Sequence, residues 1–172
     1  MKNNIIFIGI TGGSGSGKST LANALKIKFS NKIELIHLDD YIKPLHERRV
    51  FDGLINTDHP DSIDFINLKR DIVELASKEL SAIILIEGFL LLHDYEIRKI
   101  LDISIYLDLS EEVRWARRLY PKDETRRRKI LIPMHNKYIE PTKKYANYII
   151  NVNNLSKEEV FEKTEKIVRQ VF

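Results

Sequence analysis

The distribution of apolar and polar residues along the chain predicts short buried strands separated by longer amphipathic segments. Five runs of five or six residues consist mainly of apolar side chains, with isoleucine the commonest. Such runs are typical of strands that are buried on both faces of a parallel sheet. They comprise residues 5–10, 33–38, 82–86, 103–107 and 148–152.

Helices are predicted between these runs, and most have a recognisable start signal. Asp64 can cap a helix, and Ser110 precedes two acids that suit a first helical turn. Ser156 and Glu159 form a capping-box pattern ahead of the last helix. The predicted helical stripes are residues 21–29; Phe65, Leu68, Ile72 and Leu75; residues 110–119; and Val160, Thr164, Ile167 and Val171.

The alternation of strands with helices predicts an α/β fold, a doubly wound five-stranded parallel sheet with flanking helices. Ligands of such sheets bind beyond the carboxyl ends of the strands. Residues 41–61 carry two prolines and one glycine among mixed charges, so we expect a loop with a short helix there. No repeat or linker divides the sequence, and we expect residues 1–172 to form one domain.

The residues between the first run and the first helix fit the pattern G-x-x-x-x-G-K-[ST] without a mismatch. Between a strand and a helix, this pattern predicts a phosphate-binding loop (P-loop) and a P-loop NTPase fold, although a flexible turn is the alternative. Glycines let backbone N–H groups surround an anion at the start of the helix. We expect Lys18, in a solvated loop, to reach the phosphates of ATP and Ser19 to bind Mg²⁺. The predicted ATP-binding residues of the loop are Gly12, Gly13, Ser14, Gly15, Ser16, Gly17, Lys18, Ser19 and Thr20.

Composition excludes several classes of protein. The 172 residues are 43% apolar and 31% charged, as in an ordinary globular domain. The absence of cysteine rules out disulfides and thiolate metal sites. The first apolar run is too short for a signal peptide or a membrane span, so we expect a cytoplasmic protein without a membrane partner. A net charge of +3 does not by itself argue for nucleic acid.

Acidic residues follow the second and third runs, where a parallel sheet would deliver them to the phosphate site. Phosphoryl transfer needs a group that takes the proton of the attacking hydroxyl, and carboxylates for the metal. We therefore expect Asp39 to be the catalytic base and a metal ligand, while Lys18 assists the transfer. Glu87 is in the position of a Mg²⁺-binding acid. The alternative is that these acids cap turns, and for Asp40 neither reading is favoured.

The substrate side of the expected site depends on fewer signals. A loop carboxylate such as Asp58 can accept two hydrogen bonds from a cis-diol, or it can be a turn residue before Pro60. Tyr41 is expected to line the substrate pocket, or else to pack the loop. His59 is expected beside it, or else in a turn role, and none of the five histidines has metal-ligand spacing.

Five sequence strings occur in the order found in uridine kinases. They are residues 11–20, His37-Leu38-Asp39-Asp40-Tyr41, Asp58-His59-Pro60-Asp61-Ser62-Ile63-Asp64, Glu87-Gly88-Phe89-Leu90-Leu91 and Pro141-Thr142-Lys143-Lys144-Tyr145-Ala146. The chain resembles that family, and the related nicotinamide riboside kinases, over residues 5–151. The resemblance implies ATP and Mg²⁺ as cofactors, Asp39 as the base, Glu87 as a magnesium-associated acid and Asp58 as a ligand of the ribose hydroxyls.

Two departures from uridine kinases bear on recognition of the base. Those enzymes carry a β-hairpin between the helix after Asp-His-Pro-Asp and the strand before Glu-Gly, and the hairpin contacts the pyrimidine. Here residues 76–82 join helix to strand directly, and Thr57 stands where that family usually has phenylalanine. Residues 39–44 resemble the nicotinamide riboside branch, whereas residues 141–145 resemble the uridine branch.

Residues 114–132 contain a dense basic cluster, and we expect this segment to form a lid. Arg117 and Arg118 are expected at ATP, and Arg126 and Arg128 at the substrate, with one or more of the later arginines on the phosphates. A solvated helix face and a nucleic-acid patch are the alternatives, and the patch would want more interleaved aromatic residues. The cluster comprises Arg114, Arg117, Arg118, Arg126, Arg127, Arg128 and Lys129.

These features favour a small-molecule kinase that transfers the γ-phosphate of ATP to a hydroxyl, most simply the 5′-OH of a ribonucleoside. Nicotinamide riboside or another small metabolite is the first alternative acceptor. A P-loop switch or ATPase without an acceptor is the alternative from another class, and a degenerate nucleotide-binding regulator is a third. A GTPase would need Asn-Lys-x-Asp after a late strand, which the chain lacks. The expected partner is a small molecule and not nucleic acid. The sequence is compatible with either a monomer or a homo-oligomer.

Overall fold

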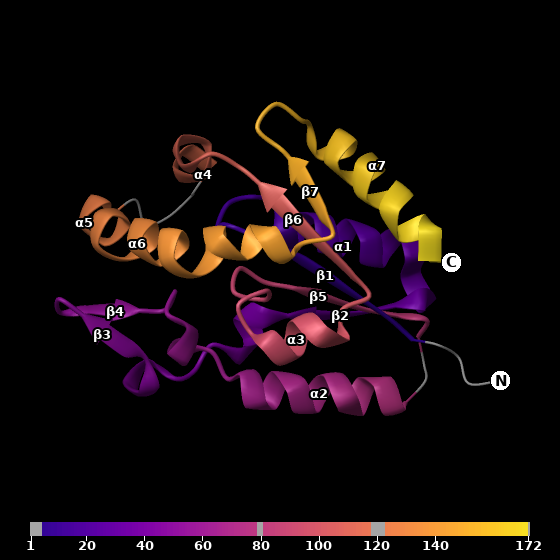
Figure 1. Ribbon diagram of the computed structural model, residues 1–172, viewed down its shortest axis with the longest axis horizontal. Coiled ribbons are helices and arrows are strands. Elements are labelled where there is room, and N and C mark those ends of the chain that lie inside the picture. The colour runs from indigo at the N-terminus through magenta and orange to yellow at the C-terminus, as the bar shows by residue number, and fades with distance from the viewer. Residues whose placement is uncertain (1–4, 79–80, 118–122, 172) are drawn as a thin grey trace.

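The computed structural model describes residues 5–78, 81–117 and 123–171. Its centre is a five-stranded sheet in the order β2-β5-β1-β6-β7, with every adjacent pair parallel (Figure 1). The predicted doubly wound parallel sheet is therefore confirmed. The strands are β1 (Ile6–Gly12), β2 (Ile33–His37), β5 (Ile83–Glu87), β6 (Ile103–Asp108) and β7 (Tyr148–Asn151).

Helices cover both faces of the sheet. Helices α1 (Lys18–Phe29) and α7 (Lys157–Val168) pack on one face, and α2 (Phe65–Ser77) and α3 (Tyr95–Ile100) pack on the other (Figure 1). The sequence did not predict α3, which has only six residues. The remaining helices are α4 (Glu111–Arg117), α5 (Glu124–Arg126) and α6 (Ile132–Met134).

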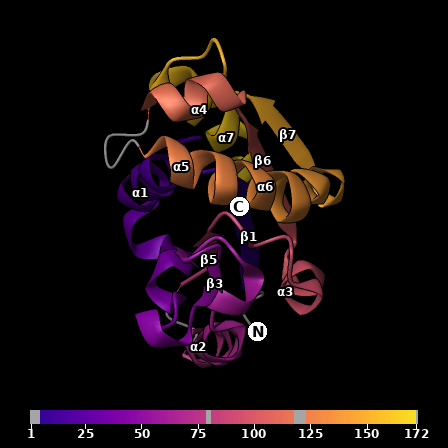
Figure 2. The same ribbon diagram turned by 90° about the vertical axis from the view of Figure 1, so that its left-hand side faces the viewer.

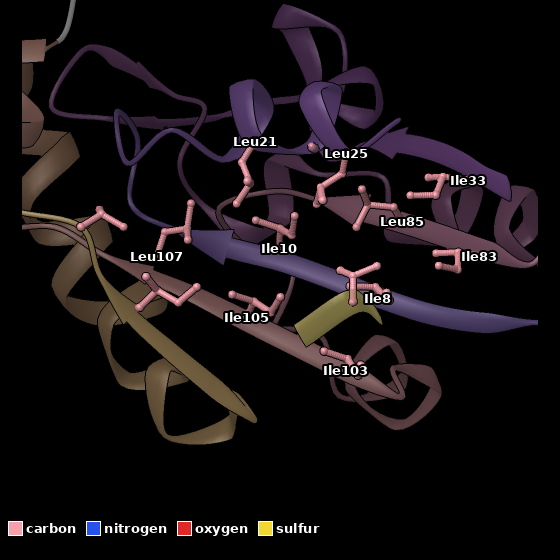
Figure 3. Close-up of a cluster of buried hydrophobic side chains, with 14 of the residues drawn as sticks. Ile8, Ile10, Leu21, Leu25, Ile33, Ile83, Leu85, Ile103, Ile105 and Leu107 are labelled. Carbon is pink, nitrogen blue, oxygen red and sulfur yellow. The ribbon is translucent and has the colours of Figure 1, made fainter. Parts of the chain in front are cut away.

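The apolar runs form two buried clusters because each strand is covered on both faces. In β5, Ile83 and Leu85 face the cluster shown in Figure 3, whereas Ile84 and Ile86 face the cluster under α2 and α3. All four side chains are at most 1% exposed. Burying one such side chain is worth about 1.5–3 kcal/mol, and this burial explains why the strands read as continuous apolar runs.

The start signals of two helices act as predicted. The Asp64 side chain accepts a hydrogen bond from the backbone N–H of Asn67, and Ser156 and Glu159 form the full capping box of α7. Helix α4 begins at Glu111, but its predicted end at residue 119 lies outside the described residues. Within the described chain, no helix has both the length and the apolar character that crossing a membrane requires.

The segment predicted as a loop contains a β-hairpin, so that part of the prediction is wrong. Strands β3 (Arg49–Phe51) and β4 (Leu54–Asn56) pair antiparallel. Asp52 and Gly53 connect them with φ angles of 49° and 71°. A two-residue turn with positive φ at both positions favours Asp-Gly, and this signal was present in the sequence. The hairpin lies at the same end of the molecule as α5 and α6 (Figures 1 and 2).

Short 3₁₀ and π segments complete the described chain. The 3₁₀ segments are η1 (Ser30–Lys32), η2 (Leu38–Tyr41), η3 (Leu45–Glu47), η4 (Pro60–Ser62), η7 (Glu140–Tyr145) and η8 (Arg169–Val171). The π segments are η5 (Arg127–Leu131) and η6 (His135–Ile139). Together with α5, α6 and η7, the π segments make an unbroken helical path from residue 124 to residue 145.

Candidate functional site

The P-loop joins β1 to α1 through three glycines with positive φ. Gly12, Gly15 and Gly17 have φ angles of 136°, 84° and 96°. A Cβ atom on Gly12 would lie 2.4 Å from the carbonyl oxygen of Leu107, so only glycine fits between β1 and β6. These conformations curl the backbone at the N-terminus of a twelve-residue helix, where unpaired N–H groups can bind an anion.

Lys18 is buried within this loop, contrary to the expected solvated position. Its side chain folds back so that Nζ donates a hydrogen bond to the carbonyl oxygen of Gly13 at 3.0 Å, and the residue is only 8% exposed. Burial lowers the pKa of Lys18, and the negative charges of Glu87 and Asp39 oppose that shift. The Lys18 ammonium group is therefore already positioned inside the P-loop.

Glu87, at the end of β5, contacts the end of β2 and the start of α1. Its Oε1 atom accepts a hydrogen bond from the Ser19 hydroxyl at 3.0 Å and lies 2.7 Å from Nδ1 of His37. The residue is 3% exposed. A Cβ atom on Gly88 would lie 2.2 Å from that of Leu38, so the glycine lets η2 pack directly against the end of β5. The structure thus brings the predicted metal residues Ser19 and Glu87 into contact.

These oxygen donors suit Mg²⁺ better than a softer metal. The part of the chain that the structure describes has no group of three or more histidine, cysteine or acidic side chains able to enclose an ion. Mg²⁺ is commonly held by one or two protein oxygens and completes its shell with phosphate and water. The donor set of Ser19 and Glu87 fits that pattern.

Asp39 lies on η2 at the carboxyl end of the sheet. The residue is exposed, yet the surrounding protein desolvates its carboxyl group. This desolvation, helped by the negative charge of Glu87, raises the pKa of Asp39, while Lys18 acts in the opposite direction. A carboxylate with a raised pKa beside a phosphate loop has the character of a proton acceptor.

A small cavity lies between the P-loop and the helical path of residues 124–145. It offers about 40 Å³ of space, enough for a few water molecules. Its walls include the P-loop Ser14, the loop residue Asp58 and the aromatic Trp115. The full lining is Ser14, Asp58, Glu111, Arg114, Trp115, Arg127, Leu131, Ile132, His135 and Ile139.

Each of the predicted substrate-binding arginines has a different environment. An Nη atom of Arg126 lies 3.7 Å from Oδ2 of Asp58, and the other donates to the carbonyl oxygen of Ile55 at 2.7 Å. Arg128 is largely exposed and pairs with Glu124, so the structure does not bring it to the cavity. Arg127, which was predicted as one of three arginines that could reach the phosphates but not as a substrate residue, lines the cavity, and its guanidinium lies 4.9 Å from the centre of the Trp115 ring.

Arg114 was part of the predicted basic cluster but was not assigned to ATP. Its side chain occupies the space that a Cβ atom on Gly13 would need, and its Nε donates to the Leu109 carbonyl at 3.1 Å. Its position in the sequence could have indicated this contact. Arg114 lies one turn into the helix that follows β6, and β6 is the neighbour of β1, which leads into the P-loop. Arg118 lies outside the described residues.

Arg117 faces a second and larger pocket next to the P-loop. The pocket has a volume of about 590 Å³, and Gly15, Ser16, Gly17 and Thr20 form one wall. The connection from β7 to α7 and the start of α7 form the opposite wall. Its lining comprises Gly15, Ser16, Gly17, Thr20, Leu21, Ala24, Arg117, Val152, Leu155, Ser156, Lys157, Val160 and Phe161.

Tyr41 and His59 contact neighbouring elements. The Tyr41 hydroxyl donates to the Asp71 carboxylate of α2 at 3.0 Å, away from the cavity that contains Asp58. His59 accepts a hydrogen bond from the Asp61 backbone through Nδ1, and its Nε2 lies 3.1 Å from the Tyr138 hydroxyl. Both contacts correspond to the packing and turn alternatives, and neither side chain lines the cavity.

Comparison with known proteins connects this geometry to one group of enzymes. Residues 76–159 match the sequence pattern of the family described as Phosphoribulokinase / Uridine kinase. The chain is similar to a uridine kinase of Clostridium novyi, with 37% identity over 84% of this chain and 86% of that one. It is 31% identical to a uridine kinase of Streptococcus gordonii over 99% of both chains. Among solved structures, a possible uridine kinase from Bacillus stearothermophilus matches 86% of this chain and 89% of its own, with a TM-score of 0.64 at 21% identity.

Proposed function

The chain belongs to the phosphoribulokinase and uridine kinase family of ATP-using phosphotransferases with an alcohol acceptor, and we propose that it phosphorylates the 5′-hydroxyl of a ribonucleoside. One observation carries the proposal. The acid suited to a ribose diol, Asp58, and the P-loop residue Ser14 line the same cavity. An acceptor held by Asp58 would therefore be next to the phosphate that it receives.

The P-loop would hold the phosphates of ATP. In our proposal Lys18 exchanges its hydrogen bond to Gly13 for one to the β- and γ-phosphates. The large pocket beside Arg117 and Thr20 then takes the remainder of the nucleotide. Ser19 and Glu87 would hold Mg²⁺, which when bound neutralises the charge that develops on the phosphates. Arg114, which covers Gly13, would contribute a second positive charge.

Asp39 acts as the proton acceptor in this proposal. The 5′-oxygen of the acceptor forms a bond to the γ-phosphorus, and the bond between that phosphorus and the bridging oxygen of ADP breaks. The hydroxyl proton passes to the Asp39 carboxylate. The raised pKa of Asp39 supports this role, because a stronger base takes the proton more readily.

The helical path from residue 124 must move before the acceptor can enter. Sites for small molecules usually measure several hundred Å³, whereas the cavity at Asp58 has about 40 Å³. We therefore propose residues 124–139 as the lid, which moves the expected segment of residues 114–132 toward the C-terminus. Its arginines Arg126 and Arg127 would close over the acceptor and exclude water, which protects the phosphate from hydrolysis.

Recognition of the base would differ from that of a pyrimidine-specific enzyme. The five residues between α2 and β5 are too few for a base-reading hairpin. The hairpin that this chain does have, β3–β4, contacts the lid through Arg126 and through Asn56, whose side chain lies 3.2 Å from Sδ of Met134. We expect a required ribose and a less selective base site, so nicotinamide riboside is the first alternative to a pyrimidine nucleoside.

A panel of matched nucleosides tests this proposal. Wild-type protein should consume ATP only when an acceptor is present, and ribonucleosides should exceed their 2′-deoxy analogues in kcat/KM by at least about tenfold, the effect of roughly 1.4 kcal/mol from an unpaired polar group. Asp58→Ala should abolish that preference. Asp61→Ala is the matched control, because its carboxylate pairs with Arg49 and lies outside the cavity.

Two results would count against the proposal. Equal rates on ribose and deoxyribose substrates would remove Asp58 from the site. ATP hydrolysis that is unaffected by any acceptor in the panel would favour an ATPase or switch in place of a kinase.

A further inference from the structure

His135 is the most deeply buried polar side chain in the wall of the acceptor cavity. Its side chain is 8% exposed, and it lies at the start of η6, one face of which turns toward Asp58 and Ser14. The two π segments of the lid explain how it reaches the cavity. In an ordinary α-helix of 3.6 residues per turn, positions spaced by four residues move progressively to another face. The π turns add residues to the path, so that four positions with this spacing all line the cavity: Arg127, Leu131, His135 and Ile139.

The two ring nitrogens of His135 have different surroundings. Nε2 lies 3.3 Å from a carboxylate oxygen of Glu140, which also accepts a hydrogen bond from the Tyr106 hydroxyl. Burial and the nearby Arg114 charge lower the pKa of His135 to about 4, so the ring is neutral at neutral pH. A carboxylate only accepts, so we assign the single ring proton to Nε2, which leaves Nδ1 with a free lone pair.

That Nδ1 atom is buried and has no hydrogen-bond partner among the described residues. Nε of Arg127, on the same cavity wall, is likewise buried without a partner. Leaving such atoms unpaired costs about 1–3 kcal/mol each, so native proteins rarely do so without a ligand or water. An unpaired acceptor and an unpaired donor in one cavity indicate a ligand that carries both kinds of group.

We propose that His135 is a specificity-determining residue that accepts a hydrogen bond, through Nδ1, from a hydroxyl or N–H group of the alcohol acceptor. This inference rests on the proposed nucleoside kinase function. Asp58 and His135 would then be two acceptors for two donors, which suits a polyhydroxylated ligand such as a ribose. The neutral ring avoids placing another positive charge beside Arg114 and Arg127.

Two substitutions separate contact with substrate from a purely structural role. His135→Asn keeps a hydrogen-bonding atom near the place of Nδ1 and loses the contact to Glu140. His135→Gln keeps an atom near the place of Nε2 and loses the one at Nδ1. We expect His135→Gln to raise the KM for uridine or nicotinamide riboside about tenfold with an unchanged KM for ATP, whereas His135→Asn stays within about threefold of wild type.

Thermal unfolding should give the opposite order, with a lower Tm for His135→Asn than for His135→Gln. Trp115, the only tryptophan of the chain, lines the same cavity, so its fluorescence reports uridine binding even in a variant with weak turnover. Fluorescence titrations should therefore show weaker uridine binding for His135→Gln than for His135→Asn and wild type, in parallel with the KM values.

The inference is overturned if KM follows Tm, or if His135→Gln binds and phosphorylates the acceptor as wild type does. Either result would make His135 a structural residue of the lid, while leaving the proposed kinase function intact. Failure of the proposed function itself looks different, because the wild type would then phosphorylate no member of the nucleoside panel.

Discussion

Two charged side chains at the phosphate site are held where their ionised forms are disfavoured. Burial lowers the pKa of Lys18, and desolvation with a neighbouring carboxylate raises the pKa of Asp39. Each shift means that the ionised group is less favourable in the folded protein than in the unfolded chain, so its charge lowers the free energy of unfolding. Such groups are typical of functional sites, where binding or proton transfer benefits from the same feature that reduces stability.

Asp39→Asn should lower kcat by about 10²- to 10⁴-fold and leave the affinity for ATP nearly unchanged, since a positioned base contributes about that much. Wild-type kcat/KM should fall with decreasing pH through the raised pKa of Asp39, and steady-state assays across pH would measure it. Asp40→Asn removes the same charge from the adjacent residue and should have a small effect. Comparable losses in both variants would contradict the assignment of Asp39 as the base.

Asp39→Asn should also raise Tm at neutral pH. Because the pKa of Asp39 is higher in the folded protein than in the unfolded chain, its destabilising effect is absent below the unfolded pKa of about 3.9 and complete above the folded one. The advantage of the variant should therefore disappear in acid. Thermal unfolding followed at several pH values tests this sign, and a variant less stable than wild type at neutral pH would contradict it.

Lys18→Ala should reduce kcat/KM by at least about 10²- to 10³-fold, the usual effect of removing one electrostatic donor from a transition state. Because the substitution removes a buried cation whose pKa is lowered, Tm should be equal to or above that of wild type. Kinetics and thermal unfolding of the same preparation distinguish loss of chemistry from loss of fold. Near-normal turnover would refute the role of the P-loop.

At the scale of elements, neighbouring arginines of the proposed lid have different partners because they lie on different faces of its helical path. Arg126 bridges Asp58 and the β3–β4 hairpin, whereas Arg128, two residues later, pairs only with Glu124 among the described residues and is largely exposed. Loss of a hydrogen bond to a charged group costs about 1.5–3 kcal/mol, but exposed ion pairs contribute little.

We therefore expect Arg126→Ala to raise the KM for the nucleoside acceptor by about tenfold or more, and Arg128→Ala to leave it nearly unchanged. Both variants lose one positive charge from the same lid, so general electrostatic effects cancel in the comparison. Equal KM values for the two variants would show that the lid acts through its net charge and not through Arg126.

For the molecule as a whole, side-chain contacts join the proposed lid, residues 124–139, to the β3–β4 hairpin. Lys129 of the lid pairs with Asp52 in the hairpin turn, and Arg126 and Asn56 add two further contacts. Figures 1 and 2 show the hairpin and the helices α5 and α6 at the same end of the molecule. In our proposal, an acceptor enters the cavity only after these contacts separate.

A covalent link between the lid and the hairpin should block turnover. The chain has no cysteine, so the double variant Asp52→Cys with Lys129→Cys offers a single pair for a bifunctional thiol reagent. The linked protein should lose most nucleoside phosphorylation, because the lid cannot open, and each single-cysteine variant treated alike should retain it. Full activity of the linked protein would show that the acceptor enters without separation of lid and hairpin.

The sequence by itself determined the parts of this protein that depend on local pattern. Burial on both faces makes the strands of a parallel sheet read as continuous apolar runs. The glycines of the P-loop were visible in its sequence pattern. The Asp-Gly turn of the hairpin was equally local and could have been recognised. Sequence alone also placed Ser19 and Glu87 near one another, because parallel strands end at one edge.

Only the tertiary structure decided which side chains meet across the cavity. Arg126, Arg127 and Arg128 are adjacent in sequence and similar in chemistry, and their separation follows from the helical path that carries them. His135 carried no signal, since its position beside Asp58 depends on π turns and on the packing of the lid against the P-loop. Contacts between residues far apart in the chain are set by packing as a whole, and no local pattern encodes them.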